Sequence, residues 1–277
     1  MKCAWKELLA ILPPWCRPEA DRLGRDTLQE LRLRLNLPPE LVRSNGAVKL
    51  NRNICNEDLS YIVNSASRYS PWSAATAAQG YITAPGGHRI GLCGQAVMQG
   101  SDMTGLRQIT SLCIRIARDF PGIAHNLNCR TGSVLIIGKP GSGKTTLLRD
   151  LIRQRSDGGE GSIAVVDERG ELFPPGLLIG CRTDILTGCS KVQGMEILLR
   201  TMSPATIAID EITSERDCEA LIKAGWCGVS LLATAHASSK EDLYNRPVYK
   251  PLVRSHIFDT LVILHSDKSW KVERMEL

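Results

Sequence analysis

Apolar and polar residues alternate in short runs along the first half of the chain, a pattern typical of strands with one buried face. Asn45 and Gly46 stand between two such runs, and this pair accepts positive φ at both positions of a hairpin turn. The pattern predicts strands over residues 31–37 and 111–118, strand-turn-strand units over residues 41–50 and 80–92, and a helix over about residues 57–68. The first half is therefore expected to be an α+β domain.

Continuous apolar runs separated by helical stretches characterise the second half. Strands that are apolar on both faces are typical of a parallel sheet covered by helices on both sides. The predicted strands cover residues 134–137, 163–166, 207–209, 229–234 and 261–264, and the predicted helices cover residues 144–154, 195–202 and 215–224. We expect an α/β domain over residues 131–277, preceded by the smaller α+β domain over residues 1–130, with a polar linker at residues 126–132.

Charge is divided unevenly between these halves. Residues 1–130 hold 16 basic and 10 acidic residues, whereas residues 131–277 hold 18 and 19, giving a net charge of +5 for the chain. Thirteen of the basic residues in the first half are arginines, which suit bidentate contacts to phosphate or carboxylate. No apolar run approaches the roughly 20 residues needed to cross a bilayer, and the first residues are too interrupted for a secretory signal.

The ten cysteines are conspicuous in number but not in spacing, because none forms a C-x-x-C pair. Structural zinc sites favour such close pairs, so no structural metal is expected. We expect most of these cysteines to be small buried apolar residues in a reducing compartment.

A phosphate-binding loop follows the first apolar run of the second half. Gly138-Lys-Pro-Gly-Ser-Gly-Lys-Thr145 fits the pattern G-x-x-x-x-G-K-[ST], between a predicted strand and a predicted helix. Glycines let backbone N–H groups curl around phosphate oxygens, and the helix start adds its positive dipole end. Lys144 is expected to reach the β- and γ-phosphates and Thr145 to bind Mg²⁺ through its hydroxyl. The candidate ATP ligands are Gly138, Lys139, Pro140, Gly141, Ser142, Gly143, Lys144, Thr145 and Thr146.

Acidic and histidine side chains end three of the other predicted strands, at the sheet edge where the loop lies. Asp210 is expected to hold Mg²⁺ through water, and Glu211 to accept a proton from the attacking water. Glu168 is a candidate for orienting water or metal, with a solvated turn as the alternative. His236 is a candidate sensor of the γ-phosphate, with a structural role as the alternative.

Together these features resemble the secretion ATPase superfamily, the hexameric RecA-like motors of type II and type IV secretion and of pilus retraction. The features are the phosphate loop, the acidic run 167–171, the segment 198–211 and residues 234–236. Within that superfamily the chain is similar to members that act in endospore formation. The marks of this closer similarity are residues 30–34, 86–92, 114–118, 143–150 and 166–169, so the resemblance runs from about residue 30 to about residue 240.

The resemblance implies roles that composition does not show. The loop would be the Walker A element, Asp210 and Glu211 the Walker B element, residues 167–171 the Asp box and His236 the His box. The first domain would pack on the ATPase domain of a neighbouring copy and complete its site with arginines, the candidates being Arg89, Arg107 and Arg115. The implied protein is a cytoplasmic homo-oligomer, expected to be a hexamer, that energises a channel between mother cell and forespore through its membrane proteins.

Two departures from the superfamily pattern keep alternatives open. Ala205 follows Pro204 where secretion ATPases usually carry Asp, and Lys139 resembles the extra lysine of deviant Walker ATPases, which dimerise around nucleotide. A deviant-Walker dimer is disfavoured by Pro140 and by the adjacent acids at 210–211. A nucleic-acid-stimulated RecA-like ATPase fits the basic first half, but only 5% of residues are aromatic and no aromatic-plus-basic run is present. A small-metabolite kinase and an ATP-dependent scaffold are further alternatives.

Overall fold

The computed structural model describes residues 1–67, 80–129, 131–159 and 161–275. The chain divides into two compact units. The first unit consists of Met1–Asp119 with Pro174–Leu177, and the second of Phe120–Phe173 with Leu178–Leu277. No helix within the described ranges is both long and apolar enough to cross a membrane.

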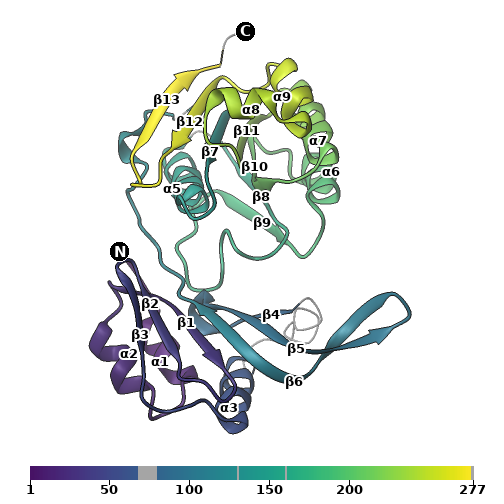
Figure 1. Ribbon diagram of the computed structural model, residues 1–277. Coiled ribbons are helices and arrows are strands. Elements are labelled where there is room, and N and C mark those ends of the chain that lie inside the picture. The colour runs from purple at the N-terminus through teal and green to yellow at the C-terminus, as the bar shows by residue number, and fades with distance from the viewer. Residues whose placement is uncertain (68–79, 130, 160, 276–277) are drawn as a thin grey trace. The chain divides into compact units, whose positions relative to one another are not determined.

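An antiparallel sheet of six strands, in the order β3-β2-β1-β6-β5-β4, forms the first unit together with helices (Figure 1). The strands are β1 (Leu28–Arg34), β2 (Glu40–Arg43), β3 (Gly46–Lys49), β4 (Tyr81–Thr83), β5 (Arg89–Gln99) and β6 (Asp102–Arg115). The helices are α1 (Trp5–Ile11), α2 (Arg17–Leu23) and α3 (Asn56–Ser67), with a short 3₁₀ turn, η1 (Pro85–Gly87). Apolar residues of the sheet and helices form one core, which explains the alternation seen in the sequence.

The first hairpin differs from its prediction at the turn. Arg43 pairs with Gly46, so the turn residues are Ser44 and Asn45. Gly46 has a φ of +123°, whereas Asn45 is not among the residues with positive φ. The expectation of positive φ at both Asn45 and Gly46 was wrong, because the turn lies one residue earlier and Gly46, which lacks a Cβ, is already the first residue of β3.

Strands β5 and β6 are much longer than predicted and continue as a two-stranded ribbon beyond the rest of the sheet (Figure 1). The register shifts between Cys93 and Gln95, where Gly94 crosses close to the partner strand. A Cβ at Gly94 would lie 2.8 Å from the carbonyl oxygen of Gln108, so only glycine fits this crossing. The ribbon was not predicted because an outlying pair of strands has no buried face to impose strict alternation.

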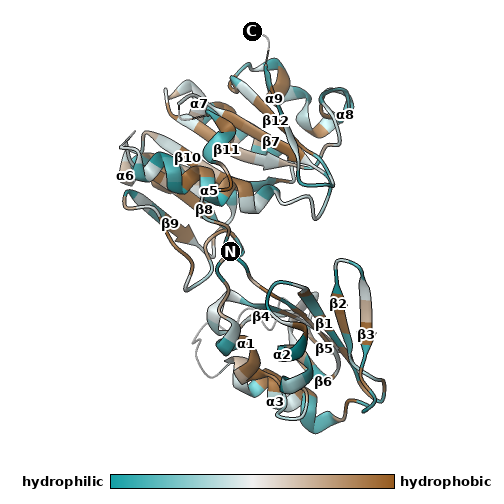
Figure 2. Cartoon of the chain, turned by 90° about the vertical axis from the view of Figure 1, so that its left-hand side faces the viewer, coloured by the Kyte–Doolittle hydropathy of each residue, from teal (hydrophilic) through white to brown (hydrophobic). Residues whose placement is uncertain are grey.

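The second unit contains a seven-stranded sheet in the order β13-β12-β7-β11-β10-β8-β9, parallel except for β13. The strands are β7 (Val134–Gly138), β8 (Ile163–Asp167), β9 (Thr183–Thr187), β10 (Thr206–Ile212), β11 (Ser230–Ala235), β12 (Thr260–Leu264) and β13 (Trp270–Arg274). The five predicted strands are the contiguous centre of this sheet, and the two unpredicted strands, β9 and β13, are its edges. Figure 2 shows apolar residues concentrated on the central strands.

Helices cover both faces of this sheet, as the sequence predicted. They are α5 (Lys144–Asp157), α6 (Lys191–Met202), α7 (Glu215–Trp226), α8 (Lys240–Asn245) and α9 (Lys250–Arg254), with the 3₁₀ turns η2 (His125–Leu127) and η3 (Pro247–Tyr249). Helix α5 contributes to the core on one face, and α6, α7, α8 and α9 contribute to the core on the other. Helix α6 begins four residues before its predicted start, where the Ser190 hydroxyl accepts a hydrogen bond from the Gln193 N–H.

The cysteines are free thiols, and the expectation that most are buried was wrong. Only Cys16, Cys129 and Cys218 are buried. Cys93, Cys181 and Cys227 are exposed, and the other four are half-buried. The reason is position: Cys93 lies on β5 where it leaves the covered part of the sheet, and Cys227 follows the last residue of α7.

Candidate active site

The phosphate loop joins β7 to α5 and takes its shape from glycine. Gly141 and Gly143 have φ values of +75° and +103°, which residues with a Cβ rarely adopt. A Cβ at Gly138 would lie 2.5 Å from the Ser142 hydroxyl oxygen, so the loop closes on itself only with glycine there. Gly143 is the N-cap of α5, and no side chain caps the first turn. The loop therefore presents uncapped helix N–H groups to an anion, which fits a nucleotide phosphate.

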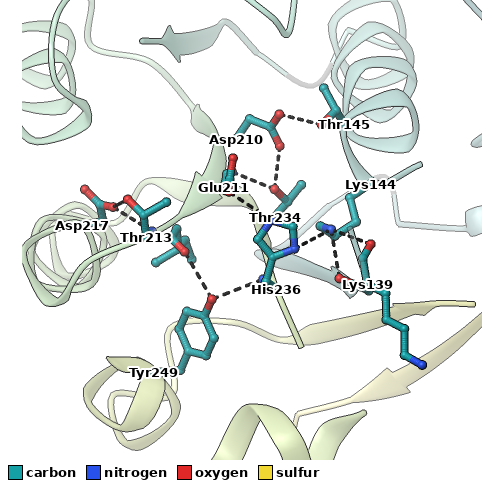
Figure 3. Close-up of polar contacts among 12 residues, drawn as sticks. Lys139, Lys144, Thr145, Asp210, Glu211, Thr213, Asp217, Thr234, His236 and Tyr249 are labelled. Atoms are coloured by element: carbon teal, nitrogen blue, oxygen red, sulfur yellow. Dashed lines mark hydrogen bonds and ion pairs between the residues drawn. The ribbon is translucent and has the colours of Figure 1, made fainter. Parts of the chain in front are cut away.

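Lys144 lies at the centre of the site and is only 7% exposed (Figure 3). Its ammonium group donates hydrogen bonds to the carbonyl oxygens of Gly138 (2.9 Å) and Lys139 (3.1 Å) and to Nδ1 of His236 (3.1 Å). The pKa of Lys144 is lowered overall, because burial lowers it more than the nearby carboxylates Asp210 and Glu211 raise it. The sequence prediction that Lys144 and His236 share one site is consistent with these contacts.

His236 connects this lysine to the predicted catalytic base. An ammonium group has no lone pair, so Nδ1 of His236 must accept the hydrogen bond from Lys144. In the neutral ring the proton then sits on Nε2, which lies 3.0 Å from Oε1 of Glu211 and donates to it. Lys144, His236 and Glu211 therefore form a continuous hydrogen-bonded chain (Figure 3).

Asp210 lies beside the loop with two hydroxyl groups as partners. Its Oδ2 accepts a hydrogen bond from the Thr145 hydroxyl at 2.7 Å, and its Oδ1 accepts one from the Thr234 hydroxyl at 2.6 Å. Hydroxyl and carboxylate oxygens are the ligands that Mg²⁺ prefers. Thr145 and Asp210 are thus placed side by side as the sequence predicted, and their donor atoms fit Mg²⁺.

Glu211 has an unusual backbone. Its φ is +58°, and its N–H donates to the Thr234 hydroxyl oxygen at 2.7 Å. The pairing of β10 with β11 shifts register between Ile209 and Ile212, which is a β-bulge. Positive φ is uncommon for residues other than glycine, and such strained residues cluster at functional sites. The bulge turns the Glu211 side chain toward His236, a feature that the strand pattern did not indicate.

Glu168 lines the same small cavity as Asp210 and Glu211, about 30 Å³ in volume. Its carboxylate pairs with the ammonium group of Lys191 at 2.7 Å, and this lysine side chain is nearly buried. The structure therefore brings Glu168 to the site and gives it a lysine partner at the start of α6. Sequence reasoning missed Lys191, because nothing in its spacing marks it as a partner.

Asp167, the preceding acid, organises the turn after β8. Its carboxylate accepts hydrogen bonds from the N–H groups of Glu171 (2.9 Å), Leu172 (2.9 Å) and Phe173 (3.0 Å). The pKa of Asp167 is raised overall, because burial raises it more than the hydrogen bonds from Phe173 and Leu172 lower it. The acidic run thus contains one carboxylate that holds the backbone and one, Glu168, that faces the cavity.

The candidate arginines lie in the first unit, on β5 and β6. The Arg89 guanidinium stacks on the Tyr81 ring at 4.3 Å, and Arg107 donates to the Gln95 side chain at 3.1 Å. Arg115 is 3.7 Å from Glu30, and its side chain is 70% exposed. Their action on a neighbouring copy stays a prediction.

Comparisons with known proteins identify the family to which this chain is similar. The model of a family described as "Sporulation stage III, protein AA" matches residues 17–273. The stage III sporulation protein AA of Bacillus subtilis (strain 168) is 38% identical over 256 residues, which cover 87% of this chain and 83% of that protein. The uncharacterized protein ycf45 of Cyanidium caldarium is 31% identical over 183 residues, which cover 60% of this chain and 53% of that protein.

Two solved structures share the fold. The pilus retraction motor PilT with bound ADP has a TM-score of 0.62 at 14% identity, covering 94% of this chain and 82% of that one. The Legionella pneumophila ATPase DotB has a TM-score of 0.59 at 16% identity, covering 93% and 78%. The predicted fold class is confirmed: a largely parallel α/β sheet like that of secretion ATPases, preceded by an antiparallel N-terminal sheet.

Proposed function

This chain belongs to the sporulation stage III, protein AA family, and we propose that it is an ATP-hydrolysing, oligomeric motor that energises a secretion-like channel complex during endospore formation. The observation that carries the ATPase proposal is the meeting of Lys144, His236 and Glu211 in one hydrogen-bonded chain at the phosphate loop. The fold shared with a pilus retraction motor supports the motor part, and family membership supports the role in sporulation.

Nucleotide binding would use the loop and its two basic side chains. The loop over residues 138–146 would hold the phosphates through its backbone N–H groups, except at Pro140, which has none, and Lys144 would exchange His236 for a phosphate oxygen. Thr145 and Asp210 would hold Mg²⁺, Asp210 through water, in place of their mutual hydrogen bond. The ion, when bound, neutralises charge on the phosphate oxygens. Lys139 stands on the loop as a further candidate ligand.

Hydrolysis would then depend on where Glu211 points. Its carboxylate accepts a proton from the attacking water, and His236 holds it in place through Nε2. Glu168 orients water in the cavity that it shares with Glu211. Because phosphoryl transfer needs positioning and charge stabilisation above all, positive charge from Arg89 and Arg115 of a neighbouring copy would complete the site.

Assembly and location follow from the same proposal. Residues 131–277 would be the motor domain, and residues 1–130 would supply arginines to the next copy in a homo-oligomer, expected to be a hexamer. The oligomer would work in the cytoplasm of the mother cell, at the membrane, bound to membrane proteins of the channel complex. Mass measurement with and without ATP tests assembly, and a monomer in both conditions would contradict it.

Phosphate release from Mg·ATP tests the enzymatic core of this proposal. Lys144→Ala should weaken nucleotide binding, while Lys240→Ala, at the first residue of α8, should not. Glu211→Gln should retain binding but slow hydrolysis by roughly 10²–10⁴-fold, the usual contribution of general acid–base catalysis. Glu219→Gln on α7 is the matched control, since Glu219 is exposed. A Glu211→Gln protein that hydrolyses ATP at the normal rate would disprove the base assignment.

A nucleic-acid-stimulated ATPase is the second candidate, favoured by the basic first half of the chain. The same assay with single-stranded DNA, RNA or lipid vesicles added separates the two. Strong stimulation by nucleic acid alone would overturn the secretion-type motor. A wild-type protein that neither binds nor hydrolyses ATP would overturn both.

A further inference from the structure

The bulge that carries Glu211 interrupts the pairing of two central strands. Ile209 pairs with Ala233 and Ile212 pairs with Ala235, so Asp210 and Glu211 together face Thr234 alone. A bulge leaves backbone groups without their usual ladder partners, and those groups need other partners when they are buried. The Thr234 hydroxyl satisfies the Glu211 N–H on one side of the bulge.

Tyr249 supplies the partner on the other side. It comes from η3 and is only 3% exposed. Its hydroxyl oxygen accepts a hydrogen bond from the His236 N–H at 3.2 Å, and its O–H donates to the Ile212 carbonyl at 3.2 Å (Figure 3). Burial raises the pKa of Tyr249, which favours the neutral phenol that can donate.

The residues after Ile212 are fixed independently. The Asp217 carboxylate accepts hydrogen bonds from the N–H groups of Thr213 (2.9 Å) and Ser214 (3.1 Å), as part of the capping box that starts α7. Thr234 therefore holds the backbone at Glu211, and Asp217 holds the backbone after Ile212. Thr234, a residue of β11, bridges to β10 at Asp210 and Glu211. Tyr249 lies outside both strands and joins the His236 N–H to the Ile212 carbonyl beyond the bulge.

We propose that Tyr249 is a positioning residue for hydrolysis, whose hydroxyl fixes the backbone of His236 against that of Ile212 and so sets the contact between His236 and Glu211. This inference rests on the proposed ATPase function. Tyr249 makes no hydrogen bond to the loop or to Lys144 among the described residues, so it acts on Glu211 geometry and not on nucleotide binding. Its ring packs in the core with apolar residues of α8 and α9, which a phenylalanine would preserve.

The test is Tyr249→Phe. Tyr244→Phe is the matched control, because Tyr244 on α8 is an exposed tyrosine. Misplacing a reacting group by 1 Å costs roughly 10²-fold in rate, so a smaller displacement is expected to lower kcat about tenfold. The dissociation constant of a fluorescent ATP analogue should stay within about twofold, because the loop is unchanged. Tyr249→p-aminophenylalanine keeps the donor to Ile212 but offers only a weak acceptor to the His236 N–H, so its rate should lie between those of the wild type and Tyr249→Phe.

A double variant distinguishes positioning from a general loss of structure. If Tyr249 acts through Glu211, then Glu211→Gln combined with Tyr249→Phe should be no slower than Glu211→Gln alone. A full additional tenfold loss would overturn the inference, as would equal rates for Tyr249→Phe and Tyr244→Phe, or a Tyr249→Phe protein that does not fold. A wild-type protein without ATPase activity would instead overturn the proposed function itself.

Discussion

Thr234→Val removes one hydroxyl from the site without changing the shape of the side chain. Thr234 is fully buried, donates to the Asp210 carboxylate at 2.6 Å and accepts from the Glu211 N–H at 2.7 Å. A hydrogen bond to a charged group contributes about 1.5–3 kcal/mol to stability and a neutral one about 0.5–1.5 kcal/mol. The free energy of unfolding should therefore fall by about 2–4 kcal/mol.

Urea denaturation measures this loss, and Thr206→Val is the control. Thr206 lies at the other end of β10, is 6% exposed, and its hydroxyl has no hydrogen-bond partner among the described residues. Both variants should keep the slope of the denaturation curve, so that the midpoints report stability alone. ATP hydrolysis should fall in Thr234→Val, because Asp210 and Glu211 both lose a support. Unfolding free energies within about 0.5 kcal/mol of each other, together with equal hydrolysis rates, would refute this account of the bulge.

Three further predictions concern other parts of the chain. Burial lowers the pKa of His88, so the unfolded state takes up a proton first as pH falls below about 6.5. Stability should therefore decrease from pH 7.5 to 5.5 in urea denaturation, and His88→Phe should reduce that decrease. A Cβ at Gly194 would lie 2.4 Å from a β8 valine, so Gly194→Ala should cost about 1–3 kcal/mol in the same measurement, whereas Gly105→Ala, in open space, should cost less. Mixing Lys144→Ala with Arg115→Ala subunits should restore part of the hydrolysis if arginines act between copies, and no recovery at any ratio in intact oligomers would exclude this.

The centre of the second sheet could be predicted from sequence because burial on both faces leaves a continuous apolar run. Strands β7, β8, β10, β11 and β12 all show this run. Strands β9 and β13 lie at the edges and are only partly buried, so their residues carry no such signal. The same reasoning accounts for the unpredicted length of β5 and β6, since the ribbon lies beyond the covered part of its sheet.

The site residues that lie at or near the ends of strands could be predicted from the sequence. Lys144 and His236 come after central parallel strands, and Asp210 lies near the end of another. Parallel strands end at a common edge, so the topology implied that these residues are close together. The residues that position these side chains leave no recognisable pattern in the sequence. Lys191 pairs with Glu168 across 23 positions, and the partners of Tyr249 are backbone groups, which any residue possesses. The spacing of side chains in the sequence can indicate contacts between functional groups. It cannot indicate a hydrogen bond between a side-chain hydroxyl and a backbone group.

His236 holds both the lysine expected to bind phosphate and the glutamate expected to activate water. If Lys144 turns to a phosphate, Nδ1 of His236 loses a charged hydrogen-bond donor, and we expect the strength of the hydrogen bond from Nε2 to Glu211 to change with it. Because the Tyr249 hydroxyl accepts a hydrogen bond from the His236 N–H, we expect this change to move the Glu211 side chain and not the His236 backbone. We therefore expect a phosphate bound at the loop to change the position of Glu211 through the His236 ring.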